Sequence, residues 1–151
     1  MATTATVTIA SDIYPGFSGI NKTMTLTQAG VTTDIEETTG YSRRKLTAAS
    51  AVDLIVMADL QVETDDSKAA KLFIKNIGDG KGNIDKSVFV SIGLGTVGSA
   101  GTTADYQEIS KLYGGDWMMI PLTGIDATGD VQAVPEKDDA VVLEYVMFFE
   151  Q

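Results

Sequence analysis

The chain has 151 residues, of which 44% are hydrophobic and 21% are charged, and it contains neither histidine nor cysteine. This size and composition predict one globular domain with its own hydrophobic core. The absence of both residue types excludes imidazole as a general base, thiolate as a nucleophile or metal ligand, and disulfide bonds. We therefore expect no enzymatic activity, no metal and no cofactor, and we look for function on the surface.

Eleven basic and 21 acidic residues give the chain a formal net charge of −10. This charge repels the phosphates of nucleic acids and anionic lipid head groups, so we expect neither nucleic acid nor a membrane as a partner. The longest apolar runs, such as residues 54–58 and 145–149, are far shorter than the roughly 18 residues that cross a bilayer. Residues 1–10 lack the basic flank and apolar stretch of a secretory signal.

The N-terminal third reads as short strands separated by turns. Residues 5–9 and 23–27 alternate between threonine and apolar side chains, which predicts half-buried strands. Between them, a Tyr-Pro-Gly-Phe turn exposes Tyr14 and Phe17 as a docking tip. We expect the extended segment Met1–Ala10 to serve as an arm that pairs with a neighbouring sheet edge.

The remaining elements also read mainly as strands. Segments 71–77 and 87–94 flank a glycine-rich stretch and predict a β-hairpin. Residues 106–113 fit either a strand or a short helix ended by the two following glycines, and we favour the strand. Other strands are predicted at 52–56, 117–122 and 141–149, the last as a core strand because its odd-numbered residues are all apolar.

The spacing of these elements indicates the fold class. Strands at intervals of about ten residues, without a sustained amphipathic helix, predict an all-β protein built as an antiparallel β-sandwich or barrel. We assign residues 1–20 to an N-terminal extended arm, or a first strand with its loop, and residues 21–151 to a single β-sandwich domain.

Two motifs resemble catalytic or cofactor signatures. Gly93–Gly98 spells the dinucleotide-binding pattern, but the sequence after it does not predict the required helix, so we favour a loop. Ser42 and Lys45 have the spacing of serine acyltransferases, but the companion motifs are missing and chance explains the match.

Acidic residues suggest two further functions, calcium binding and glycoside hydrolysis. The segment 79–85 contains oxygen ligands that suit calcium, but Lys81 occupies a ligand position, so we favour a hairpin turn. The acidic pairs at 65–66 and 138–139 are read as solvated loops rather than glycosidase carboxylates.

Two segments are candidates for an interface. The only dense basic cluster, residues 43–45, is either a docking patch for an acidic neighbour or a charged strand edge that deters unwanted pairing. The four apolar residues 117–120 belong either to a strand buried on both sides or to a contact between subunits. With the aromatic turn, the candidate interface residues are Tyr14, Phe17, Arg43, Arg44, Lys45, Trp117 and Met118.

Residues 71–150 contain a characteristic order of strands and turns, in the segments Lys71–Asn76, Val88–Ile92, Lys111–Leu122 and Glu144–Glu150. A strand ending in Lys-Asn is followed by its hairpin partner, by a Gly-Asp-aromatic turn into an Ile-Pro-Leu strand, and by a terminal aromatic strand. This order resembles small structural proteins of tailed-phage virions. The resemblance implies a jelly-roll-like β-sandwich that acts as a capsid decoration or cement protein, often as a trimer, and it brings no catalytic residues.

We therefore expect a virion protein, assembled in the host cytoplasm, that binds across subunits of the major capsid protein and stabilises the shell. Its expected partners are the major capsid protein or other virion proteins, and further copies of itself in a homo-oligomer such as a trimer. Two alternatives stay open. One is a tail or fibre adaptor, and the other is a carbohydrate-binding β-sandwich module with an exposed aromatic platform such as Tyr14, Phe17 or Trp117.

Overall fold

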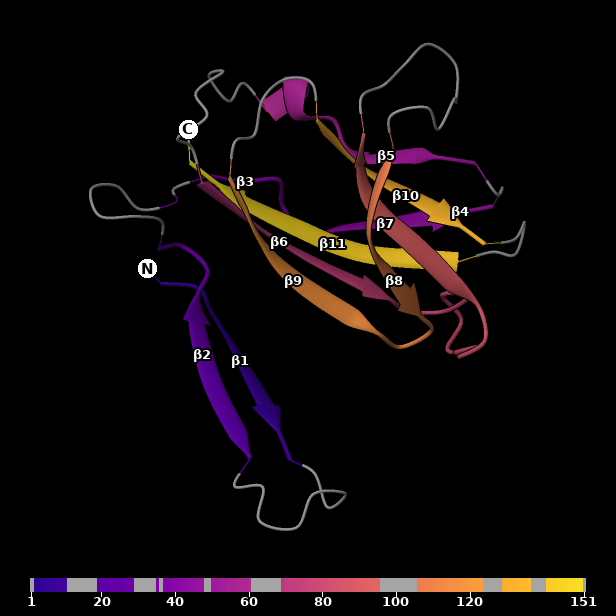
Figure 1. The fold of residues 1–151 in the computed structure, drawn as a ribbon, viewed down its shortest axis with the longest axis horizontal. Coiled ribbons are helices and arrows are strands. Elements are labelled where there is room, and N and C mark those ends of the chain that lie inside the picture. The colour runs from indigo at the N-terminus through magenta and orange to yellow at the C-terminus, as the bar shows by residue number, and fades with distance from the viewer. Residues whose placement is uncertain are drawn as a thin grey trace.

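The structure is a computed structural model that describes residues 2–10, 19–28, 35, 37–47, 50–60, 69–95, 106–123, 129–136 and 141–150 (Figure 1). Nearly all regular structure in these residues is β-strand, and none of their helices is long and apolar enough to cross a membrane. The elements are β1 (Thr4–Ile9), β2 (Ile20–Thr25), β3 (Glu37–Thr38), β4 (Ser42–Leu46), β5 (Val52–Ile55), the 3-10 helix η1 (Met57–Leu60), β6 (Ala69–Asn76), β7 (Phe89–Gly95), β8 (Gln107–Tyr113), β9 (Trp117–Thr123), β10 (Asp130–Pro135) and β11 (Val141–Phe149).

Two antiparallel sheets pack face to face. In the first, named here the β11 sheet, the strand order is β3-β11-β6-β9, and β4 also pairs with β11. In the second, the β7 sheet, the order is β5-β10-β7-β8. The predicted all-β antiparallel sandwich is confirmed, and its jelly-roll connectivity stays a prediction.

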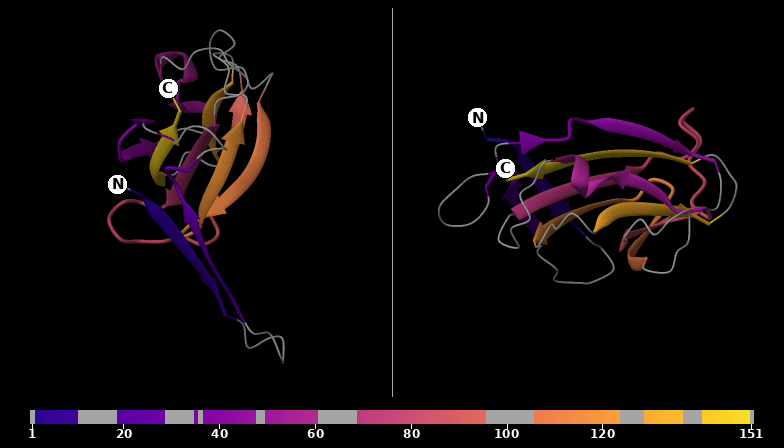
Figure 2. Two further views of the ribbon diagram at one scale, coloured as in Figure 1. Left: turned by 90° about the vertical axis from the view of Figure 1, so that its left-hand side faces the viewer. Right: turned by 90° about the horizontal axis from the view of Figure 1, so that it is seen from above.

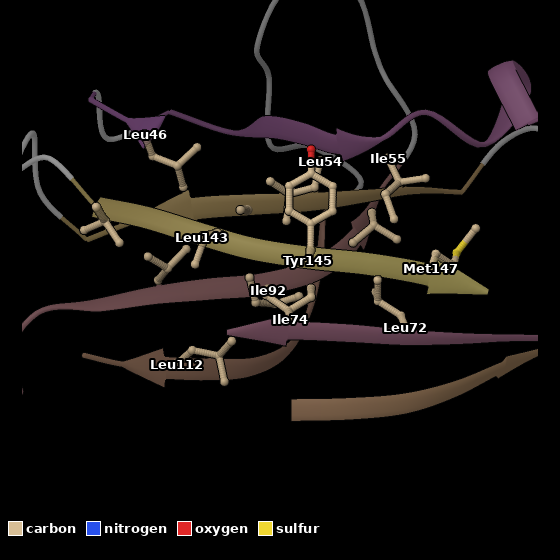
Figure 3. Packing of buried hydrophobic residues seen from close by; sticks show 14 of the residues in the cluster. Leu46, Leu54, Ile55, Leu72, Ile74, Ile92, Leu112, Leu143, Tyr145 and Met147 are labelled. Carbon is tan, nitrogen blue, oxygen red and sulfur yellow. The ribbon is translucent and has the colours of Figure 1, made fainter. Parts of the chain in front are cut away.

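The core lies between the two sheets and is built from alternating residues of each strand (Figure 3). The predicted core strand 141–149 is confirmed as β11, whose side chains Leu143 and Met147 are completely buried. Ile74 of β6 and Ile92 of β7 are also completely buried and meet in this layer. The burial of these residues follows the period of two that their sequences predict.

The predicted hairpin of 71–77 and 87–94 is wrong. Strand β6 pairs with β11 and β9, whereas β7 pairs with β10 and β8, so the chain crosses from one sheet to the other between them. Both strands have an apolar inner face, and this pattern is the same whether two strands pair side by side or face each other across a core. The side chain of Asn76 fixes the crossing, since it donates to the Leu112 carbonyl oxygen at 3.0 Å and accepts from the Gly78 amide at 2.9 Å.

Residues 106–113 form a strand rather than a helix. This prediction is confirmed by β8, which pairs with β7. The glycines at 114 and 115 then turn the chain from the β7 sheet into β9 of the β11 sheet. In the earlier segment 52–56, the strand ends at Ile55, which is buried together with Leu54, and η1 follows.

The first two strands form a separate antiparallel hairpin, named here the N-terminal hairpin. Its register runs from Thr4 opposite Thr25 to Ile9 opposite Ile20, and it projects away from the sandwich (Figures 1 and 2). The described part of the expected arm, residues 2–10, therefore includes a strand that pairs within its own chain. Because β2 begins at Ile20, the domain boundary predicted after residue 20 falls within this hairpin.

Candidate protein-docking face

The side of the β11 sheet that points away from the core carries a continuous apolar strip. Phe73 of β6 lies between Val146 of β11 and Met119 of β9 as their direct cross-strand neighbour. One pair further along, Lys75 lies opposite Trp117. We call this side the outer face, and its central residues are Phe73, Lys75, Trp117, Met119, Val146 and Phe148.

Trp117 is the most exposed apolar residue of this strip. Its side chain is 46% exposed, and its ring centroid lies 6.2 Å from that of Phe73 with the planes tilted by 33°. Met118 points the opposite way and packs against the core. The apolar run at 117–120 thus divides between two sides of one strand, so Met118 belongs to the core packing and Trp117 to the surface.

The N-terminal hairpin stands over part of the outer face and is attached to it at its base. The Leu26 amide donates to the Thr3 carbonyl oxygen at 2.7 Å, and the Leu26 side chain is buried. The ammonium group of Lys71, on β6, donates to the carbonyl oxygens of Thr25 and Gln28. The Leu26–Thr3 bond closes the base of the hairpin, and the Lys71 bonds attach this base to the sandwich.

Between the hairpin and the sheet lies an open groove, which we call the wedge. Its larger part has a volume of about 530 Å³ and is bounded by the outer face and by hairpin residues that include Thr3, Ala5 and Leu26. Its smaller part, of about 250 Å³, reaches along the hairpin to Val7, Lys22 and Met24. The two parts share three residues, Ala5, Trp117 and Met119, which form the middle of the wedge.

The basic cluster at 43–45 is divided by the alternation of β4. Arg43 lies opposite Glu144 and Lys45 opposite Val142, which places both on the outer side of the β11 sheet. Arg44 instead reaches the other sheet, where its guanidinium donates to the Asp53 carbonyl oxygen of β5 at 2.7 Å. Arg43 and Lys45 therefore extend the outer face, while Arg44 joins the two sheets at their edge.

Glu144 is the one acidic residue in strands β4, β6, β9 and β11. It forms an ion pair with Arg43 and lies opposite Lys75 on the other side. A hydrogen bond from Tyr41, followed by the Arg43 guanidinium, lowers the pKa of the Glu144 carboxyl below its ordinary value. The same bond raises the pKa of the Tyr41 hydroxyl. The negative charge on this face is therefore already matched by its neighbours.

The opposite surface, on the β7 sheet, has polar side chains that bond to one another beside two exposed apolar residues, Ile109 and Tyr113. Ser91 donates to the Glu108 carboxylate at 2.6 Å, and the Gln132 amide donates to the Asp53 carboxylate at 2.8 Å. The Lys111 ammonium lies 4.7 Å from the ring centroid of Phe89, a cation–π contact.

The glycines of the dinucleotide-like motif serve packing. Gly93 and Gly95 lie in β7, so the loop favoured from the sequence is wrong for these positions, and Gly98 lies outside the described residues. A Cβ at Gly93 would lie 2.5 Å from the Tyr106 ring, and one at Gly95 would overlap the Gln132 side chain. Burial, and then the nearby Glu108 charge, raise the pKa of Tyr106 to about 12. Because Gly93 has no side chain, there is room beside it for the ring of Tyr106. Gly95 likewise leaves room for the Gln132 side chain.

The other motifs also have structural explanations where they are described. Asp79 accepts hydrogen bonds from the Lys81 amide at 2.7 Å and from the Asn83 side chain at 2.8 Å, so its carboxylate is bonded within its own loop. The Asn83 bond is the main reason that the pKa of Asp79 is lowered. No group of three or more acidic residues that could hold a metal occurs in the described parts of the chain.

Some of the residues that the sequence motifs single out do not lie together in the structure or are not described by it. Ser42 lies opposite Tyr145 on the core side of β4, whereas Lys45 lies on the outer side, so the acyltransferase spacing has no geometric counterpart. Tyr14, Phe17 and the acidic pairs at 65–66 and 138–139 lie outside the described residues.

Three residues of the outer face, Phe73, Val146 and Phe148, were not selected from the sequence, whereas Met119 belongs to the candidate run 117–120. All four occupy outward positions of strands whose inward positions are also apolar. The available signal was this two-sided apolar pattern, which marks strands covered on both faces. These residues meet on one surface because of the order of the strands in the sheet. The sequence of a single strand does not give this order.

Comparison of the chain with protein-family models, curated proteins and solved structures finds no match.

Proposed function

We propose that the protein is a structural protein of a tailed-phage virion, a capsid decoration or cement protein that binds across subunits of the major capsid protein. The observation that carries the proposal is the outer face with its half-exposed Trp117. Continuous apolar surface of this kind is typical of protein interaction sites, where buried aromatic residues supply much of the binding energy. The resemblance of residues 71–150 to virion proteins supplies the class of partner.

The composition suits a permanent assembly. Without histidine, the chain has no side chain with an ordinary pKa near neutrality, so its charge stays nearly constant between roughly pH 5.5 and 8. A cement protein stabilises a shell because it binds the assembled lattice in preference to free subunits, which shifts the equilibrium toward assembly. Jelly-roll-like connectivity, self-association as a trimer and location in the virion belong to this proposal.

The first test is binding of the purified chain to shells assembled from the major capsid protein encoded in the same genome. We expect saturable cosedimentation and a higher temperature of shell dissociation. Replacing Trp117 by alanine should weaken binding by about tenfold or more, since a buried aromatic anchor is lost. The matched control is Tyr113→Ala, which removes a similarly exposed aromatic ring, 41% exposed, from the β7 sheet.

Three outcomes would contradict the proposal. The first is that the shells bind neither form of the chain, and the second is that both variants bind equally well. In the third, electron microscopy of virions places the chain in the tail, which would favour the adaptor. Glycan-array binding that is lost in Trp117→Ala would favour the carbohydrate-binding module.

A further inference from the structure

We propose that the wedge binds an extended segment of the partner protein that carries apolar side chains and carboxylates in alternation. This inference rests on the proposed function in one respect, namely that the outer face docks onto a protein. It adds the chemistry of the segment that is bound and the residues that recognise it.

The charge distribution favours an acidic partner. The chain as a whole has almost twice as many acidic as basic residues, but strands β3, β4, β6, β9 and β11 carry five basic residues and two acidic ones. The strands of the β7 sheet have the opposite balance, with three acidic residues and one basic. Positive charge is therefore concentrated on the sheet that bears the outer face, where it attracts a negatively charged segment.

Two lysines place this charge in the wedge itself. Lys75 lines the larger part from the sheet, and Lys22 lines the smaller part from the hairpin. The described residues of the hairpin, 2–10 and 19–28, contain no aspartate or glutamate. Carboxylates that enter the wedge would thus meet ammonium groups beside apolar side chains, where charge-assisted hydrogen bonds are stronger than in open water.

The single carboxylate of the outer face does not oppose such a partner. Glu144 is paired with Arg43 and lies beside Lys75, so its charge is matched within the chain. Its side chain is only 11% exposed, which limits direct repulsion of an incoming carboxylate.

The middle of the wedge provides the apolar part of the site. Trp117 and Met119 are outward residues two positions apart on β9, and Phe73 lies beside them on β6. A bound strand presents side chains to each side in turn, so its apolar residues can contact these three while its carboxylates point toward the hairpin, which carries Lys22. Lys75 lies on the same face as Trp117, and its long side chain would meet a carboxylate at the border of this contact. The apolar contacts would supply affinity, and the carboxylates would supply selectivity.

An extended conformation fits the edges that border the wedge. Strand β9 pairs with β6 and with no second strand among the described residues, and β1 and β2 likewise pair only with each other there. Unpaired backbone groups at such edges accept an added strand. A segment that leaves the wedge past β9 can therefore continue as an added strand at the edge of the sheet.

Single-stranded nucleic acid is the competing occupant, because phosphates also seek lysines and bases stack on aromatic rings. The observations favour protein. The wedge includes the apolar side chains of Val146 and Met119, which give no stacking surface for bases.

The experiment measures fluorescence anisotropy of a labelled decapeptide of alternating glutamate and valine with one central phenylalanine. Three counter-probes isolate its features: lysine in place of glutamate, serine in place of the apolar residues, and an oligothymidylate. At low ionic strength we expect the acidic apolar peptide to bind the full chain at least about tenfold more tightly than each counter-probe. Added salt should weaken the binding.

Variants then locate the site. Lys75→Gln and Trp117→Ala should each reduce the peptide affinity by about tenfold. The matched controls are Lys81→Gln, which makes the same charge change in the exposed loop between β6 and β7, and Tyr113→Ala on the other sheet. Neither control should change the affinity, and circular dichroism should show all four variants folded.

The inference is overturned if the lysine peptide or the oligothymidylate binds as tightly as the acidic peptide, or if Lys75→Gln has no effect. It is also overturned if capsid shells bind the chain while the acidic peptide does not, an outcome that leaves the proposed function standing. The acidic peptide could bind with the expected dependence on Lys75 and Trp117 while the chain does not bind capsid shells. That outcome would reject the proposed function and retain the assignment of the wedge.

Discussion

The two outward sides of the sandwich differ in how their side chains are partnered. On the β7 sheet, Ser91 and Gln132 form hydrogen bonds to neighbouring carboxylates, and the exposed Tyr113 ring packs against Phe89 with centroids 5.4 Å apart. On the β11 sheet, the strip around Phe73 and Trp117 borders an open groove. Scattered exposed apolar residues are normal on a protein surface, whereas a continuous strip beside a groove is typical of interaction surfaces.

The two sheets of this β-sandwich differ mainly in the residues on their outward sides. The inward residues of both sheets are similar aliphatic side chains that build one core. On the β7 sheet, polar side chains bond to one another beside the exposed Ile109 and Tyr113. On the β11 sheet, apolar and positively charged groups line the wedge, the surface that we propose for a partner. Substitutions on the two sides of the same strand should therefore have different consequences.

The largest expected effect is on the inner side of β11. Leu143→Ala removes a completely buried side chain and should lower the free energy of unfolding by about 2–5 kcal/mol, because a cavity remains in the core. The matched change on the outer side is Val146→Ala, for which we expect a loss of about 1 kcal/mol or less. Urea denaturation measures both values, and equal losses would contradict the distinction between the two sides.

A smaller loss of stability is expected from a substitution on the β7 sheet. Gly93→Ala should cost about 1–3 kcal/mol, since the new methyl group would overlap the Tyr106 ring and the Gln107 carbonyl oxygen. Gly82→Ala is the control: it meets no atom within 4 Å, and its φ of +100° gives a conformational cost of about 1–3 kcal/mol away from any tyrosine. Thermal unfolding with near-ultraviolet circular dichroism should show that only Gly93→Ala perturbs the tyrosine environment. An unchanged spectrum would mean that the ring does not depend on this glycine.

The fold class and most strands of this chain could be predicted from sequence, because period-two patterns report which residues face a core. The alternation over 141–149 predicts β11 in this way, and the strand favoured over a helix at 106–113 is β8. The partner of each strand could not be predicted. The apolar faces of β6 and β7 are compatible both with a hairpin and with opposite sheets, and the bonds of Asn76 that fix the crossing leave no periodic signal.

The candidate site was predicted only in part for the same reason. Trp117, Arg43 and Lys45 could be selected from the sequence because a basic cluster and an apolar run are local features. Their shared surface required the register that sets Glu144 between Arg43 and Lys75. Arg44 and Met118 were indistinguishable from their neighbours by composition, and the alternation of the two strands assigns them to the sheet edge and to the core.

Alkaline titration gives a further measure of the β7 side. Because the pKa of Tyr106 is raised to about 12 in the folded chain, its neutral form stabilises the fold fully below the ordinary tyrosine value near 10. This stability is lost as the pH rises from about 10 through 12. Water reaches part of the ring, so we expect a loss of about 1 kcal/mol. Tyr106→Phe should flatten the alkaline decline measured by chemical denaturation, and a decline of the same size would refute the assignment.

The smallest effect concerns the ion pair on the β11 side. The folded chain lowers the pKa of Glu144, so this group stabilises the fold above the pKa of the unfolded chain and loses that contribution as the pH falls through the folded value. Because Arg43 is 60% exposed, water screens the pair and the contribution should be at most about 1 kcal/mol. Glu144→Gln should therefore reduce the acid dependence of unfolding slightly, while Glu136→Gln serves as the matched control.

The same variant also tests the outer face as a binding surface. Glu144→Gln removes the one negative charge from strands β4, β6, β9 and β11 and releases Arg43 from its ion pair. If an acidic segment occupies the wedge, its affinity should rise slightly, since one repulsive charge is lost and a guanidinium becomes available. A fall in affinity would instead indicate that Glu144 holds Arg43 and Tyr41 in the arrangement that the partner needs. The sign of this small change thus separates simple charge attraction from a surface that must be ordered before it binds.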